Sequence, residues 1–298
     1  MEVAQKTYIC YYWKTYNMKE VIVRTLSGVL YISIVILSMF TSREWFMGLF
    51  FILGVITLHE FLKLVHLSGI RSYVSYLLLA VALFFFSYKF DDFIIFLAFS
   101  VYQIIAIYLL LIIGGLVNLF LLIDVLWSRK IPVFKNKKYI PVIFYIISGF
   151  VFLTLIPFQN GDFEPKILVG IFILIWSNDT FAYLIGSNFG KTKLLERVSP
   201  NKTVEGFLGG LLGSLLAGFI IFKTIDYLNL WQWLCLAIIA TVFGTIGDLI
   251  QSKFKRQAGV KDSGALMPGH GGLYDRLDSV IYSSPFIYAF LLIVDHVS

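Results

Sequence analysis

The sequence predicts an all-α integral membrane protein with about nine transmembrane helices. Of its 298 residues, 59% are hydrophobic, 17% are aromatic and only 14% are charged. This composition is too apolar for a soluble globular domain. The apolar residues also stand in long runs separated by short charged segments. A helix of about 20 residues spans the hydrocarbon layer of a bilayer, so each run is a candidate crossing.

Apolar runs bounded by charged or turn residues define the predicted spans. In chain order they lie near residues 21–40, 45–64, 73–89, 93–126, 140–158, 166–186, 204–222, 231–250 and 277–294. The fourth run is the longest and contains Gly114 and Gly115, so by itself it allows one long helix or two crossings. The distribution of positive charge favours a single crossing.

With the N-terminus in the cytoplasm and a single fourth crossing, most of the 24 Lys and Arg residues fall on the inner side. Only four are left outside, namely Arg43, Lys89, Lys166 and Lys223. Loops rich in Lys and Arg stay in the cytoplasm. We therefore expect the N-terminus inside and the C-terminus outside, and the net charge of +6 mainly reports this topology.

Composition also excludes two classes of function. The two cysteines, Cys10 and Cys235, make no disulfide framework. No basic stripe with interleaved aromatic residues marks a soluble domain, so we expect no nucleic-acid partner. The polar stretch 128–138 divides the N-terminal transmembrane helices, residues 1–130, from a C-terminal transmembrane region, residues 131–298. The latter carries the two predicted cytoplasmic loops 187–203 and 251–276.

The segment from Asp248 to Asp278 mixes carboxylates, cations and glycines between two apolar runs. If the preceding run continues as a helix, Asp248, Ser252 and Lys255 share one face. A second helix starting near Tyr274 would place Asp275 and Asp278 on one face as well. Mg²⁺ prefers a few carboxylates together with substrate phosphates, and glycines let backbone amides approach a phosphate. We therefore predict a site for a metal-bound polyphosphate, with Asp248 and Asp275 as metal ligands.

This segment resembles the signature of the phosphatidate cytidylyltransferase (CDP-diacylglycerol synthase) family. The matching positions are Ser252, Phe254, Lys255, Arg256, Lys261, Asp262, Pro268, His270, Gly271, Gly272, Asp275, Arg276 and Asp278. The stretch 189–206 is similar to a second block of the family, with departures at Asn201 and Val204, and Phe181 stands where the family commonly has glycine.

The resemblance implies an enzyme of the cell (inner) membrane that converts CTP and phosphatidate into CDP-diacylglycerol and pyrophosphate for phospholipid biosynthesis. It also implies Mg²⁺ as cofactor, a homodimer, and an active site on the cytoplasmic side of the C-terminal region. The predicted catalytic residues are Asp248, Ser252, Lys255, Arg256, Asp275 and Asp278. The predicted substrate-binding residues are Asp179, Lys191, Lys202, Lys261, Gly269, His270, Gly271, Gly272 and Arg276.

Three of these assignments rest on further arguments. A carboxylate inside an apolar span, such as Asp179, is costly and usually faces a polar cavity. Asn201 replaces a lysine of the family pattern, but Lys202 beside it retains one cation toward the phosphates. His270 could serve as a metal ligand or general acid, or could shape its glycine-rich loop through backbone hydrogen bonds, and both alternatives stay open.

Other charged residues are interpreted structurally. We expect Glu60, Asp124 and Lys253 to be charges at the membrane interface. The stretch from His59 to Leu64 also resembles family positions, and a functional role stays open for Glu60 and Asp124. Glycines at 206, 209, 210 and 213 predict a small-residue face for close helix packing. Two other classes of function remain open: a CTP-dependent lipid kinase of the polyprenol-kinase type, and a transporter. Clustering of the charges at one predicted membrane face argues against the transporter.

Overall fold

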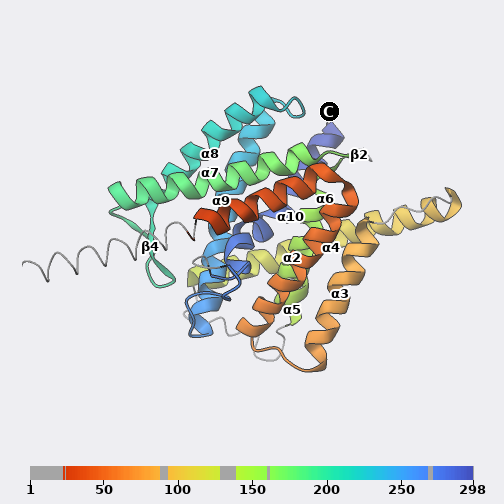
Figure 1. Cartoon of the computed structure of the whole chain (residues 1–298), viewed down its shortest axis with the longest axis horizontal. Helices are drawn as coiled ribbons and strands as arrows, with labels where there is room; N and C mark the ends of the chain where they lie inside the picture. Colours follow the sequence, from red (N-terminus) through yellow and green to blue (C-terminus); the bar gives the residue numbers. More distant parts are fainter. Residues whose placement is uncertain are drawn as a thin grey trace, which may run out of the picture.

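The computed structural model describes residues 23, 25–87, 93–127, 139–159, 162–267 and 271–297, and shows a bundle built almost entirely of helices (Figure 1). The helices are an unlabelled first helix Thr25–Thr41, α2 Arg43–Leu64, α3 Ile70–Ser87, α4 Phe93–Trp127, α5 Tyr139–Pro141, the π-helical turn η2 Val142–Ile147, α6 Ser148–Leu155, α7 Pro165–Phe189, α8 Val204–Thr224, α9 Leu230–Gln257 and α10 Tyr274–Val297.

The all-α membrane class is confirmed. Within the described ranges, six helices are long and apolar enough to cross a bilayer, and three shorter apolar helices accompany them. The short elements α5, η2 and α6 follow one another without a break and form one of these three. In its described residues, each predicted span overlaps one of these helices, while the number of crossings and their orientation stay predictions. α4 runs without interruption through Gly114 and Gly115, as the charge distribution predicted.

Helices α7 and α8 lie against each other along their length, at the top of Figure 1. The predicted glycine face forms this seam. A Cβ at Gly209 would lie 2.6 Å from the Cβ of Ile185, and one at Gly213 would lie 2.6 Å from the Cβ of Phe181. Only glycine allows the two backbones to approach this closely, so the structural interpretation of these glycines is confirmed.

Helix α10 is the most buried of the six long helices and packs against α9 and α6. Under its first turn lies a cluster of aromatic rings. Phe61 packs edge-on against Tyr145, Phe254 and Tyr274. The hydroxyl groups of Tyr145 and Tyr274 are 2.8 Å apart and hydrogen bonded. Since these rings come from α2, η2, α9 and α10, they fix the start of α10 against three other elements.

Two small antiparallel hairpins interrupt the helices, and neither was predicted. Strands β1 Phe158–Gln159 and β2 Asp162–Phe163 precede α7. Strands β3 Lys193–Leu195 and β4 Ser199–Thr203 form the second hairpin, within the predicted loop 187–203. Thr203 then caps α8, because its side chain accepts a hydrogen bond from the amide of Gly206. The second hairpin therefore holds Lys202 directly before a rigid helix.

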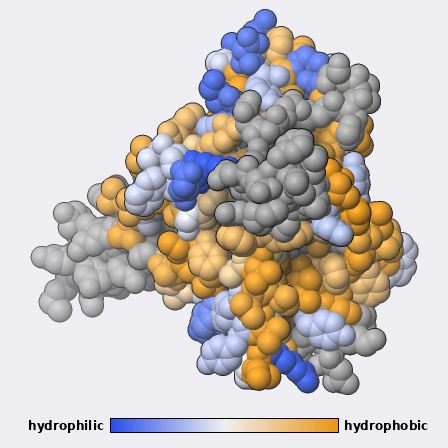
Figure 2. All heavy atoms as spheres, turned by 90° about the vertical axis from the view of Figure 1, so that its right-hand side faces the viewer, coloured by the Kyte–Doolittle hydropathy of each residue, from blue (hydrophilic) through white to orange (hydrophobic). Residues whose placement is uncertain are grey.

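The outer surface fits a lipid environment. On the face shown in Figure 2, apolar side chains cover broad continuous areas, and hydrophilic ones gather mostly toward the upper end. Helix α4 is the least buried of the long helices. Exposed large apolar side chains include Leu116 on α4, Leu77 on α3 and Leu212 on α8. Such extensive exposed apolar surface indicates contact with a membrane.

Candidate active site

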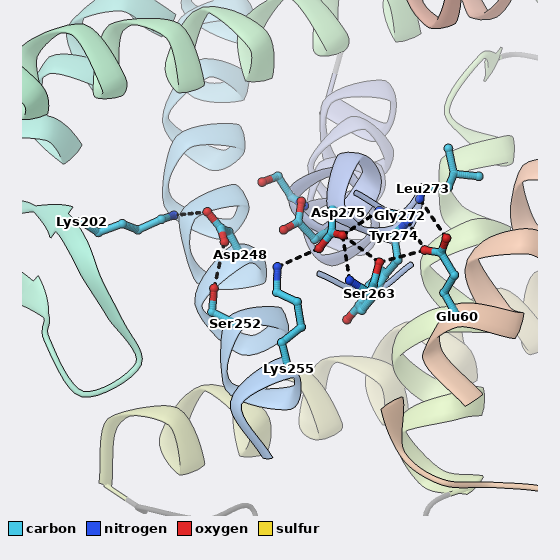
Figure 3. Close-up of polar contacts among 12 residues, drawn as sticks. Glu60, Lys202, Asp248, Ser252, Lys255, Ser263, Gly272, Leu273, Tyr274 and Asp275 are labelled. Atoms are coloured by element: carbon cyan, nitrogen blue, oxygen red, sulfur yellow. Dashed lines mark hydrogen bonds and ion pairs between the residues drawn. The ribbon is translucent and has the colours of Figure 1, made fainter. Parts of the chain in front are cut away.

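The face of α9 that the sequence predicted is present. Asp248 and Ser252 lie one turn apart, and the Ser252 hydroxyl donates to one carboxylate oxygen of Asp248 at 3.3 Å. The other carboxylate oxygen forms an ion pair with Lys202, which reaches over from β4 (Figure 3). The Lys202 side chain is 28% exposed and that of Asp248 32%, so the pair is open to a ligand.

Lys202 faces more negative charge than one carboxylate. It interacts electrostatically with Asp248, Asp179 and Asp278, which come from α9, α7 and α10. Burial alone would lower the pKa of Lys202, but the carboxylates of Asp248, Asp179 and Asp278 together outweigh burial and raise the pKa above its usual value. Three helices and one strand thus bring three predicted carboxylates and one predicted cation together.

Asp275, in the first turn of α10, lies beside this group. One of its oxygens accepts from the Lys255 ammonium at 2.7 Å. The other accepts from the Ser263 amide at 2.8 Å, the Gly272 amide at 2.9 Å and the Ser263 hydroxyl at 3.0 Å. Gly271 has a φ of +84°, and a Cβ there would lie 2.8 Å from the same oxygen. Ser263, Gly271 and Gly272 therefore pack closely around the Asp275 carboxylate.

Glu60 departs most from the position expected from the sequence. It was expected to be an interface charge, but it is only 6% exposed. Its carboxylate reaches from α2 into the loop before α10, opposite Lys255 (Figure 3). It accepts hydrogen bonds from the Ser263 hydroxyl at 2.8 Å, the Leu273 amide at 3.1 Å and the Tyr274 amide at 2.8 Å. The sequence signals were a carboxylate near the end of an apolar run and the resemblance of the stretch from His59 to Leu64 to the family.

Asp124 and Lys253 were also expected at the interface, and this was wrong. Their side chains are 6% and 4% exposed and form a buried ion pair between α4 and α9. The Lys253 ammonium donates to the Asp124 carboxylate at 3.0 Å and to the Asp124 carbonyl at 2.6 Å. Arg197, from the turn between β3 and β4, donates to the carbonyls of Val125, Leu126 and Trp127 at the end of α4. Lys253 and Arg197 therefore both hydrogen bond to the C-terminal end of α4.

Of the remaining predicted residues, Arg276 interacts electrostatically with Asp179. Glu205 accepts from the amides of Lys191 and Thr192 at 3.0 and 3.1 Å, which fixes the loop that carries Lys191. Four predicted cations are exposed, namely Lys191, Arg256, Lys261 and Arg276. Gly269 and His270 lie outside the described residues.

The arrangement suits a divalent cation only in part. Asp179, Asp248 and Asp278 bring three carboxyl groups close to Lys202, and Mg²⁺ needs only one or two carboxylates when a phosphate supplies further oxygens. Among the described residues, no three Asp, Glu, His or Cys side chains form a complete metal cage. The metal role predicted for Asp275 would require this carboxylate to give up hydrogen bonds that hold the loop.

Known proteins of similar sequence point to one family. The model of the cytidylyltransferase family matches residues 22–294. The phosphatidate cytidylyltransferase of Staphylococcus haemolyticus is 47% identical over 122 residues, which cover 41% of this chain and 47% of that protein. Those of Staphylococcus saprophyticus and Staphylococcus aureus are 41% and 40% identical over 149 residues, 50% of this chain and 56% of each relative. The chain thus spans about half the length of the curated relatives it matches. Because the family model covers nearly the whole chain, the protein belongs to the cytidylyltransferase family.

Proposed function

We propose that the protein is a phosphatidate cytidylyltransferase, which converts CTP and phosphatidate into CDP-diacylglycerol and pyrophosphate. The observation that carries the proposal is the meeting of Lys202 with three carboxylates from three helices, next to the Lys255–Asp275 pair. A nucleoside triphosphate and an anionic lipid head group need cations of this kind, held in place by carboxylates. The names of the relatives from three Staphylococcus species support the same activity.

In the proposed reaction, an oxygen of the phosphatidate phosphate attacks the α-phosphorus of CTP. The bond from this phosphorus to the oxygen bridging the α- and β-phosphates breaks, and the electron pair leaves with pyrophosphate. Phosphatidate is already ionised at neutral pH, so no strong base is needed. Catalysis then consists mainly of positioning and charge neutralisation.

The residues of the site divide this work. Lys202 and Lys255 would neutralise phosphate oxygens from two sides of Asp248, while Ser252 would orient a phosphate oxygen. The exposed cations Lys191, Arg256, Lys261 and Arg276 would attract both anionic substrates to the site. Asp275 holds the ammonium of Lys255 and the loop at Gly272 in place.

We also propose that Mg²⁺ is the cofactor. Asp248 is a suitable ligand for Mg²⁺ because its carboxylate, paired with Lys202, is partly exposed. Asp278 could contribute a second carboxylate, since it interacts electrostatically with both Lys202 and Asp248. When bound, the metal would neutralise the triphosphate. Removal of Mg²⁺ by a chelator should abolish turnover, and re-addition should restore it.

The site would lie on the cytoplasmic side of the cell membrane. Support comes from the positive-inside rule, which places the loops at 187–203 and 251–276 in the cytoplasm, where CTP is available. The family resemblance further implies a homodimer.

The test is to follow isotope from CTP into product with purified protein, Mg²⁺ and phosphatidate. Label on the α-phosphorus should appear in the lipid, and label on the γ-phosphorus should appear in pyrophosphate. Lipid that carries the γ-label, with CDP released, would instead show a lipid kinase. Uptake of a solute into proteoliposomes without any labelled lipid would favour a transporter.

A further inference from the structure

Glu60 is a buried carboxylate that accepts hydrogen bonds from three neutral donors. It lies on α2, in the N-terminal part of the chain, yet its three donors belong to Ser263, Leu273 and Tyr274, more than 200 residues later. Burial of a carboxylate is unfavourable unless the group is well hydrogen bonded. The three bonds at 2.8 to 3.1 Å supply that compensation.

Two of the donors are backbone amides at the very start of α10. The first amides of a helix have no partner within the helix, and a carboxylate placed there also interacts favourably with the helix dipole. Glu60 therefore caps α10 from another helix. Through the Ser263 hydroxyl it also holds the other end of the loop, so residues 263 and 273 are fixed to one point.

The loop backbone is shaped to admit this carboxylate. A Cβ at Gly264 would lie 2.8 Å from the carboxyl carbon of Glu60, and one at Gly272 would lie 2.7 Å from it. A side chain at either position would push Glu60 out. The two glycines thus provide an observation, independent of the hydrogen bonds, that the loop is built around this group.

The contacts continue from Glu60 toward the proposed phosphate site. The Ser263 hydroxyl lies 2.8 Å from Glu60 and 3.0 Å from Asp275, so its single proton stands between the two carboxylates. Asp275 in turn binds the Lys255 ammonium at 2.7 Å. A displacement of the loop at Ser263 therefore moves Asp275, and Lys255 loses the partner that orients it.

We propose that Glu60 is a positioning residue of the nucleotide site, which fixes Ser263 and the start of α10 at Leu273 and Tyr274, and thereby the Asp275–Lys255 pair. This inference rests on the proposed function for its kinetic consequence. Glu60 itself touches no substrate. Its removal should weaken the binding of CTP more than it slows the turnover of bound CTP, because the cation that it positions serves phosphate binding.

The perturbation is Glu60→Gln, which keeps the shape and removes the charge. The glutamine NH₂ group would replace one acceptor oxygen of Glu60, so a donor would face the donors of Ser263, Leu273 and Tyr274. We expect the KM for CTP to rise at least tenfold and kcat to change less than threefold, at a temperature where the variant stays folded. Glu44→Gln is the matched control, since Glu44 is an exposed carboxylate at the other end of α2. It should behave as wild type.

A second readout does not depend on the reaction. Amide hydrogen exchange of the peptide covering residues 263–274 should be at least tenfold faster in Glu60→Gln than in wild type or Glu44→Gln. Ser263→Ala alone should also raise the KM for CTP, and the double variant should raise it by less than the product of the two single effects, because the Ser263 hydroxyl links Glu60 to Asp275. Unchanged exchange, or faster exchange with an unchanged KM for CTP, overturns the proposal. Wild-type protein that forms no labelled lipid would refute the proposed function instead, and exchange would still decide whether Glu60 anchors the loop.

Discussion

Replacing Lys253 with methionine should destabilise the protein strongly, because it leaves the Asp124 carboxylate buried without a partner. The two side chains are 4% and 6% exposed, and Lys253 also donates to the Asp124 carbonyl at 2.6 Å. Removal of one member of a buried ion pair costs about 3–5 kcal/mol. At about 2–4 °C per kcal/mol for a large domain, the melting temperature should fall by about 6–20 °C.

The assay is thermal unfolding of the purified protein in detergent, followed by intrinsic tryptophan fluorescence. Lys223→Met is the matched control, since Lys223 is an exposed lysine on α8, and it should shift the melting temperature by less than about 2 °C. The double variant Lys253→Met/Asp124→Leu should recover at least half of the loss, because neither charge then remains buried alone. A melting temperature for Lys253→Met equal to that of Lys223→Met, or a double variant as unstable as the sum of its single variants, would refute this reasoning.

Four further predictions follow from the site, the helix packing and the topology. Asp248→Asn should insert and fold but keep less than a tenth of the turnover, a barrier increase above about 1.4 kcal/mol, measured as CDP-diacylglycerol formed. The pKa of Lys202 is raised in the folded state, so its pairing with Asp248 stabilises the folded protein fully below the usual lysine pKa of about 10.4. This stabilisation is lost as the pH rises through the raised pKa. The melting-temperature difference between wild type and Lys202→Met should therefore stay constant from about pH 7 to 9 and shrink above about pH 10.4. Gly213→Ala should lower the melting temperature because its Cβ meets Phe181, whereas Gly115→Ala, where nothing lies within 4 Å, should leave it unchanged or raise it; equal effects would contradict the tight seam. In a cysteine-free background, an impermeant thiol reagent should label Asp226→Cys in intact cells but not Glu196→Cys, and the opposite result would invert the topology.

Local patterns predicted much of the site because helical periodicity alone sets which side chains share a face. Asp248 and Ser252 could be paired from their spacing, and the start of α10 at Tyr274 followed from the change in composition. The glycine seam was predictable for the same reason, since its four residues repeat at helical spacing.

Long-range partners could not be predicted in this way. Glu60 and Asp124 each meet their partners more than 100 residues later in the chain, and no local pattern encodes such a distance. The hairpin of β3 and β4 was missed because β3 has only three residues and β4 is polar, so neither strand shows the apolar alternation that marks a longer strand.

During translation, Asp124 and Glu60 are synthesised long before the residues that bind them. Lys253 follows Asp124 by 129 residues, and Ser263 follows Glu60 by 203. At roughly 5–20 residues per second, both carboxylates wait about 6 to 40 seconds for their partners during translation. An unpaired carboxylate is costly in hydrocarbon but not at the water interface. Glu60 and Asp124 both lie within about one turn of the ends of α2 and α4. The nascent helices can therefore enter the bilayer while these two groups remain hydrated, and the carboxylates become buried only when α9 and α10 assemble against them.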